Sequence, residues 1–170
     1  DITSIPFQFE TDMGNKLVIG KRKHKAIQLD FPFPFYQQRH NNIQIFLSGY
    51  LTLIENPRKS YAGIGLKFPT IAATWIEFDS TSNSGGIFYR HESERAVITW
   101  YQLYPSNDFE STTSSDSWYT TQVVLYPDGT FILSFLDTPQ NQAFSIANKS
   151  SNLNGVGISP GSSNISAVER

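Results

Sequence analysis

Residues 121–136 read TQVVLYPDGTFILSFL, two runs of β-branched, aromatic and leucine residues on either side of Pro127-Asp128-Gly129. Proline presets φ near the value that a turn needs, and Asp-Gly supplies a residue that tolerates positive φ. The stretch therefore predicts a β-hairpin with strands over 121–126 and 130–136.

The same period-two alternation extends toward the N-terminus, and no window carries a sustained helical stripe. In residues 43–54 one face of a segment interrupted by Gly49 carries Ile43, Ile45, Leu47, Leu51 and Leu53, and the other carries Phe46, Tyr50 and Ile54. We expect this segment to be covered on both sides. Further strands are predicted over 16–19, 26–29, 71–79, 86–89 and 96–104, the last two joined by a charged turn at 91–94.

Residues 31–36 read FPFPFY. Each proline removes a ladder donor, so this segment is predicted to lie at a sheet edge with its phenylalanines over the core. Eight or more short strands with closely spaced turns are typical of an all-β fold, and we predict an antiparallel β-sandwich of two packed sheets. A chain of 170 residues fits a single domain over 1–170 that buries roughly 70% of its unfolded surface. Residues 106–117 and 148–166 are expected to be loops.

Composition excludes several classes of function. With 13 Lys+Arg against 15 Asp+Glu, no global positive field favours nucleic acid or an anionic membrane. The absence of cysteine excludes disulfides, thiolate metal sites and a cysteine nucleophile. No apolar stretch approaches the roughly 20 residues that span a bilayer, so direct membrane insertion is not expected. A start at Asp1 rather than Met suggests a processed protein or a piece of a longer one.

Ordered blocks of the sequence resemble a known family. These blocks are Phe33-Pro34-Phe35-Tyr36, Ile43–Leu53 with Gly49-Tyr50, Ile71–Asp79, Gly86–Arg90, Val97–Tyr101, Thr121–Gly129 and Gly155–Ile158. Together they cover about 26–158 and resemble the nidogen-like (NIDO) extracellular domain. The chain departs from the family pattern at Gln37, Ser48 and Ala73, where the family has Gly, Asn and Pro. The resemblance implies an extracellular module of adhesion and matrix proteins, without a catalytic constellation to transfer.

The residues themselves offer little catalytic chemistry. His91-Glu92 lacks the second histidine of a zinc helix, since Arg95 stands four residues on. Together with His24 and His40, it is expected to be structural or solvated. No Gly-x-Ser-x-Gly elbow is present to expose a serine nucleophile. We therefore expect a protein that is not an enzyme.

Glu77 and Asp79 are a candidate calcium site. Residues two apart on a strand share a face, so both carboxylates can converge on one cation with oxygens from the loop 80–85. The alternative is a solvated strand end whose carboxylates accept turn N–H bonds.

Trp118 and Tyr119 follow the polar loop 106–117 and are candidate ligand-binding residues, because exposed amphipathic rings bind well. Trp75 and Trp100 stand mid-strand among apolar residues and are expected in the core. The basic run 21–25 is expected to be a solvated hairpin tip, with contact to an acidic partner as the alternative. Asn148 and Asn164 fit the N-glycosylation pattern.

These observations lead to a functional expectation with two alternatives. The expected protein is an extracellular or cell-surface interaction module of a larger surface or matrix protein, binding a protein partner through rim loops. The first alternative is a β-sandwich that binds a glycan or senses a small ligand around Trp118 and Tyr119. The second is a hydrolase with paired titratable groups in a concave pocket. No cofactor is expected apart from the candidate calcium ion.

Overall fold

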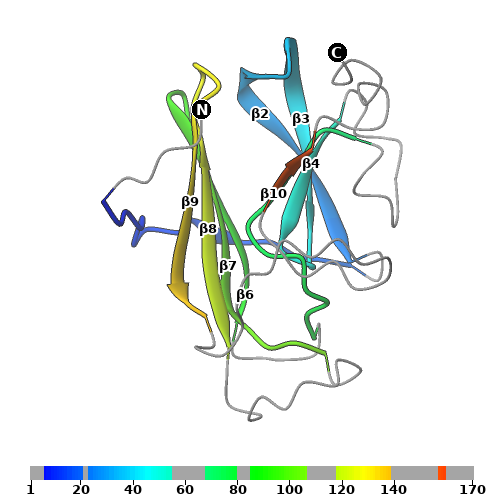
Figure 1. The fold of residues 1–170 in the computed structure, drawn as a ribbon, viewed down its shortest axis with the longest axis vertical. Coiled ribbons are helices and arrows are strands. Elements are labelled where there is room, and N and C mark those ends of the chain that lie inside the picture. Colours follow the sequence, from blue (N-terminus) through cyan, green and yellow to red (C-terminus); the bar gives the residue numbers. More distant parts are fainter. Residues whose placement is uncertain are drawn as a thin grey trace, which may run out of the picture.

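A computed structural model of the chain describes residues 6–20, 23–54, 68–79, 85–106, 118–138 and 157–159. Figure 1 shows two antiparallel sheets facing one another, so the predicted all-β sandwich is confirmed. The strands are β1 (Asn15–Lys16), β2 (His24–Phe35), β3 (Gln38–Phe46), β4 (Tyr50–Ile54), β5 (Thr70–Ala72), β6 (Gly86–Glu92), β7 (Arg95–Leu103), β8 (Tyr119–Leu125), β9 (Phe131–Asp137) and β10 (Gly157–Ser159). None of the described segments forms a helix that could cross a bilayer.

The described residues form five strands in each sheet, and we name the sheets A and B. Sheet A has the order β1-β6-β7-β8-β9, and sheet B has the order β10-β5-β4-β3-β2. Alternate residues of the central strands point into the space between the sheets and form the main core, which includes Ile43, Leu51, Ile98, Trp100 and Val123. The buried Trp100 indole donates to the carbonyl oxygen of Phe46 at 2.8 Å, so a hydrogen bond as well as apolar contact joins the sheets.

The hairpin predicted over 121–136 is present as β8 and β9. Tyr126 N–H donates to the Thr130 carbonyl at 2.9 Å, and Thr130 N–H donates to Asp128 Oδ1 at 2.8 Å. Gly129 has φ +89°, a left-handed conformation that glycine adopts without steric cost. The turn residues thus act as their sequence predicted.

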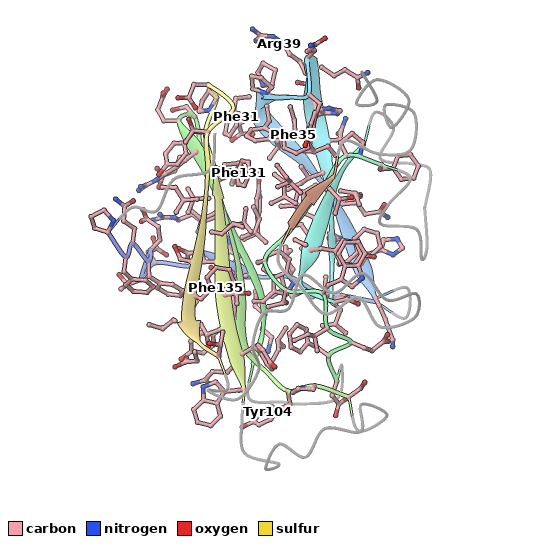
Figure 2. The ribbon with its side chains drawn as sticks, viewed as in Figure 1. Phe31, Phe35, Arg39, Tyr104, Phe131 and Phe135 are labelled. Carbon is pink, nitrogen blue, oxygen red and sulfur yellow. The ribbon has the colours of Figure 1, made fainter. Side chains whose placement is uncertain are left out.

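The phenylalanine–proline segment lies in β2, at the edge of sheet B, as predicted. Phe31, Phe33 and Phe35 alternate with the prolines and are all buried. Figure 2 shows Phe31 and Phe35 on one sheet and Phe131 on the other, near the same end of the sandwich. The rings of Phe35 and Phe131 meet edge to face with centroids 6.3 Å apart, which closes that end of the core.

The interpretation of 43–54 as one interrupted segment is wrong in one respect. Its predicted faces are correct, since the Ile43 face lies in the main core and Phe46 and Tyr50 lie on the opposite side of sheet B. The chain reverses direction between β3 and β4, however, and forms a hairpin. Gly49 has φ +81° in this turn, and Ile45 pairs with Leu51 across it.

The strand predicted over 71–79 is also shorter than expected, because β5 ends at Ala72. The N–H groups of Ala73 and Thr74 both donate to the Gly49 carbonyl, at 3.1 and 3.0 Å, and the chain bends around the β3–β4 turn. A Cβ built on Gly49 would lie 1.8 Å from Thr74 Oγ1, so this close approach requires glycine. The strand predicted over 16–19 is reduced to β1, after which Leu17 and Ile19 pack against the core.

Residues 6–14 form a feature that the sequence did not predict, and we call it the N-terminal strap. The strap lies on the side of sheet A that faces away from sheet B, drawn in dark blue in Figure 1. Side chains of β6, β7, β8 and β9 bind it. It leads into β1, which pairs with β6.

Candidate functional site

The candidate site lies at the end of the sandwich opposite the β2–β3 turn, where the chain after β5 meets the chain after β7. Asp79 N–H donates to the Tyr104 carbonyl and Ser106 N–H donates to the Glu77 carbonyl, both at 2.8 Å. Phe78 lies between these bonds and forms an isolated antiparallel bridge with Pro105. In Figure 2, Tyr104 marks this end, and Arg39 marks the other. We call residues 77–79, 104–106 and 118 the sandwich-end site.

A break in β7 directs the chain toward this end. The β7–β8 pairing changes register between Trp100 and Leu103, and Gln102 has φ +48° within that interval. A Cβ built on Gly85 would lie 2.2 Å from the Gln102 carbonyl oxygen, so the start of β6 fits closely against the break. Most residues of the two predicted loops, 80–85 and 106–117, lie outside the described residues, and the described residues next to them define the sandwich-end site.

The structure separates the two aromatic residues predicted to bind a ligand. Trp118 is 38% exposed, and its indole meets Tyr104 edge to face with centroids 6.1 Å apart. Tyr119 is 1% exposed and lies in the main core, 5.6 Å from the Phe78 ring. Burial raises the pKa of the Tyr119 phenol. Successive strand residues point to opposite sides, so only Trp118 of this pair is available to a ligand.

Glu77 and Asp79 share the solvent side of their segment, with Phe78 buried between them. The Glu77 carboxylate forms an ion pair with the Lys23 ammonium. A cation at Glu77 would have to displace that lysine, and of the expected loop ligands only Gly85 is described. Among the described residues, no three acidic or histidine side chains are grouped to hold a metal. Calcium binding by Glu77 and Asp79 stays a prediction.

An aromatic row lies on the outer side of sheet B, next to this ion pair. Phe46 and Tyr50 stack with centroids 4.4 Å apart and planes at 15°, and Tyr50 and Trp75 stack at 4.5 Å and 11°. The His24 ring continues the row at 5.2 Å from Phe46. Phe46 and Tyr50 are buried while Trp75 is partly exposed. Trp75 therefore lies outside the inter-sheet core, contrary to expectation, because β5 ends before it.

The aromatic row and the Lys23–Glu77 pair interact electrostatically. Burial, and then the negative charge of Glu77, raise the pKa of Tyr50 to about 12. The phenol therefore keeps its proton to a higher pH than an exposed tyrosine does. The basic run contributes Lys23 to this ion pair and Lys25 to the exposed surface of β2, while residues 21 and 22 lie outside the described residues.

The three histidines lie on different strands. His24 begins β2, His40 is buried in β3, and His91 in β6 contacts Asp30 with Nδ1 2.6 Å from Oδ2. The His91–Asp30 contact links the edge strand β2 of sheet B to β6 of sheet A. Both predicted glycosylation asparagines lie outside the described residues.

No family model, curated protein or solved structure matches this chain. The chemistry of the described side chains must therefore suggest what the site binds. A partly exposed tryptophan against a tyrosine, next to the chain segment that carries Glu77 and Asp79, offers apolar contact and hydrogen bonding. Such a surface suits recognition of a macromolecule or a sugar ring.

Proposed function

We propose that this chain is a non-enzymatic extracellular interaction module of a larger surface or matrix protein, and that it binds a protein partner at the sandwich-end site. The partial exposure of Trp118 beside Tyr104 is the observation that carries this proposal. Tryptophan and tyrosine are enriched among the residues that dominate binding energy in protein interfaces. A rigid base under the site also favours binding, since less conformational entropy is lost on association.

The base of the site is rigid for identifiable reasons. Phe78 and Tyr119 are both buried and pack edge to face directly behind it. The two backbone bonds around Phe78 connect chain segments from sheet B and sheet A. Binding loops commonly extend from such a scaffold, and the segments predicted from the sequence to be loops, 80–85 and 106–117, follow this base in the chain.

The extracellular part of the proposal comes from the resemblance to the nidogen-like domain. Its blocks at 33–36, 86–90, 97–101 and 121–129 fall on β2 and its turn, β6, β7, and β8 with its turn. The last two residues of the closing block lie in β10, which pairs with β5. These blocks lie on strands or their turns, and the extracellular assignment rests on the sequence resemblance alone.

The test compares two exposed aromatic residues at opposite ends of the sandwich. Trp118→Ala is expected to weaken binding to a panel of immobilised extracellular matrix proteins by about tenfold or more, the effect of a hot-spot residue. Tyr36→Ala is the matched control, because Tyr36 is 43% exposed in the β2–β3 turn. Equal binding by the two variants, measured by surface plasmon resonance, would reject the sandwich-end site.

Glycan binding is a second candidate function, favoured by the aromatic row. Trp75 ends the Phe46–Tyr50–Trp75 stack and is partly exposed. The Glu77 carboxylate, paired with Lys23, is near enough to Tyr50 to raise its pKa, so charged groups lie close to the row. Sugar rings stack on such aromatic faces. A glycan array with Trp75→Ala and Trp118→Ala separates the possibilities: loss in only one variant identifies which ring binds the sugar. Binding that survives both substitutions would reject this candidate.

A further inference from the structure

The N-terminal strap is bound by sheet A as a ligand would be. Gln122 is fully buried in β8 and its side-chain amide faces the strap. Glu10 N–H donates to Gln122 Oε1 at 2.8 Å, and Gln122 Nε2 donates back to the Glu10 carbonyl at 3.0 Å. The Ser134 hydroxyl in β9 donates to the Gln8 carbonyl. These contacts recognise main-chain groups, so they hold any peptide that follows the same path.

The Gln122 amide is held in position from within the sheet. Its Nε2 also donates to Thr99 Oγ1 on the neighbouring strand at 2.9 Å. Thr99 is fully buried, and Thr99 and Gln122 are paired in the β7–β8 ladder. The orientation of the amide is therefore fixed by the central strands of sheet A and not by the strap alone.

Two arginines add specificity for an acidic residue. Arg90 Nη2 lies 3.0 Å from one oxygen of Glu10, and Arg95 Nη1 lies 2.7 Å from the other. Arg90 Nη1 also reaches Asp12 Oδ2 at 3.0 Å. Hydrogen bonds between ionised partners are shorter and stronger than neutral ones. The Gly14 N–H and then Arg90 lower the pKa of the Asp12 carboxyl, so this residue is ionised when bound.

The charge that remains without the strap is positive. Glu92 contacts both arginines, with oxygens 2.9 Å from Arg95 Nε and 3.5 Å from Arg90 Nη1. Two guanidinium groups and one carboxylate give these three side chains a net charge of +1, and the carboxylates of Glu10 and Asp12 bind to them. An acidic segment is therefore favoured at this surface over a neutral or basic one.

The apolar side chains of the strap are exposed or only partly buried. Phe7 is 63% exposed, and its ring stacks on Phe9 of the same segment, with centroids 6.5 Å apart. Polar contacts of this kind are replaced by water or by a competing peptide at modest cost, because the net value of each hydrogen bond is small.

We propose that the outer face of sheet A is a binding site for an acidic peptide segment of a partner protein, and that the strap occupies this site in cis. The partner segment carries a glutamate at the position of Glu10 and a second acidic residue two positions later. The strap competes with it at the high effective concentration of a tethered ligand. The partner binds only when the strap withdraws, so the strap is an autoinhibitory element. This site is separate from the sandwich-end site and does not depend on its function.

The test uses the full chain and a fluorescent peptide with the sequence of residues 6–14, PFQFETDMG. Glu10→Gln removes the charge that both arginines bind and loosens the strap. We expect this variant to bind the peptide about tenfold more tightly than the wild-type chain does, measured by fluorescence anisotropy. Glu94→Gln is the matched control, because Glu94 is exposed in the β6–β7 turn and has no role in the site. It is expected to bind like the wild-type chain.

Two substitutions in sheet A test whether the peptide binds at its outer face. Adding Gln122→Ala to Glu10→Gln is expected to abolish the gained binding. Arg95→Gln, a change at a more exposed residue, serves the same purpose should the buried substitution impair folding. A peptide with glutamine in place of its glutamate is expected to bind about tenfold more weakly.

Three outcomes would overturn the proposal. The first is that Glu10→Gln gives no gain in peptide binding, and the second is that the gain survives Gln122→Ala and Arg95→Gln. The third is a concentration-dependent dimer of the wild-type chain, detected by sedimentation and lost in Glu10→Gln. That dimer would identify a second copy, and not a partner peptide, as the occupant of the site.

Discussion

The outer faces of the two sheets are covered by different kinds of contact. On sheet A, the buried amide of Gln122 and the guanidinium groups of Arg90 and Arg95 bind the backbone and carboxylates of the strap. On sheet B, the stacked rings of Phe46, Tyr50 and Trp75 cover the strands by apolar contact. One face is held by directional bonds that another peptide could reproduce, and the other by ring contacts between neighbouring strands.

Two sheets that share a core therefore need not have the same role on their outer faces. Ring stacking removes apolar area from water and belongs to the folding energy of the sandwich. Hydrogen bonds and ion pairs to the strap exchange readily with water, so their net value is smaller. We therefore expect substitutions in the aromatic row to affect global stability and substitutions under the strap to affect local attachment.

The largest effect is expected from Phe46→Ala. Removing a buried ring costs about 3–5 kcal/mol in the free energy of unfolding, since a cavity remains under Tyr50 and His24. Urea denaturation followed by tryptophan fluorescence measures the loss. Phe7→Ala is the control, because Phe7 is largely exposed, and its change should stay within about 0.5 kcal/mol. Similar losses in both variants would contradict the division between the faces.

Gln122→Ala is expected to have the next largest effect, about 2 kcal/mol, because it removes three hydrogen bonds from a fully buried position. Gln28→Ala, the same substitution at an exposed position in β2, should be nearly neutral. Measured by hydrogen exchange, Gln122→Ala should accelerate exchange of the Glu10 amide more than exchange of the amides elsewhere in the chain. Uniform acceleration across both sheets would show that the strap is part of the global folding unit.

Gly14→Ala is expected to loosen the strap by about 1 kcal/mol or somewhat more. Gly14 has φ +79°, and a Cβ there would lie 2.4 Å from the Tyr89 carbonyl oxygen. Gly20→Ala is the matched control, since a Cβ at Gly20 meets nothing within 4 Å. Limited proteolysis at the junction of the strap and β1 should be faster in Gly14→Ala than in the wild-type chain, and unchanged in Gly20→Ala. Equal cleavage of both variants would show that the conformation of Gly14 does not hold the strap in place.

The smallest effect is expected from Glu77→Gln. Its ion pair with Lys23 is about half exposed, 55% and 52% for the two side chains, so its loss should cost less than about 1 kcal/mol. The pKa of Tyr50, raised to about 12, should fall but stay above its ordinary value of 10.0, because burial is the larger cause of the shift. An ultraviolet titration of tyrosinate formation measures this change, with Glu94→Gln as the control.

The raised pKa of Tyr50 also determines whether the stability of the folded state rises or falls at high pH. The folded state holds the phenolic proton more tightly than the unfolded state does. The resulting stabilisation is complete below pH 10.0 and is lost as the pH rises toward about 12. Stability of the wild-type chain should fall over this interval, and less steeply in Tyr50→Phe. Parallel curves for the two proteins would contradict the assignment.

Local patterns were enough to predict much of the fold. The 121–136 hairpin follows from its turn residues, and the core faces of β3 and β4 follow from alternation. The end of β5 was not predictable in this way. It depends on the Gly49 carbonyl, which accepts bonds from Ala73 and Thr74 and so belongs to a distant turn. For the same reason Trp75 was assigned to the core, although it lies on the outer face.

The strap was missed because its partners are far away in the sequence. Glu10 and Gln122 are 112 positions apart, and no periodicity connects them. A signal existed in β8, where Thr120 and Gln122 occupy positions that face away from the core in an apolar strand. Buried polar side chains in a central strand require partners, and here the strap supplies two of the three hydrogen bonds of Gln122. Trp118, in contrast, was correctly expected at the surface because it follows a polar loop.

The edge strands limit how these sheets can grow. Each sheet ends in one short strand, β1 with two residues and β10 with three, which offers few main-chain groups to an added strand. At the edge formed by β2, Pro32 and Pro34 have no N–H to donate, and the Pro34 carbonyl lies close to Gly129 of the β8–β9 turn. Of the four edges that the described strands form, only β9 is a longer strand without proline. Resistance to lateral aggregation at three edges therefore comes from strand length and proline placement, without any covering helix among the described residues.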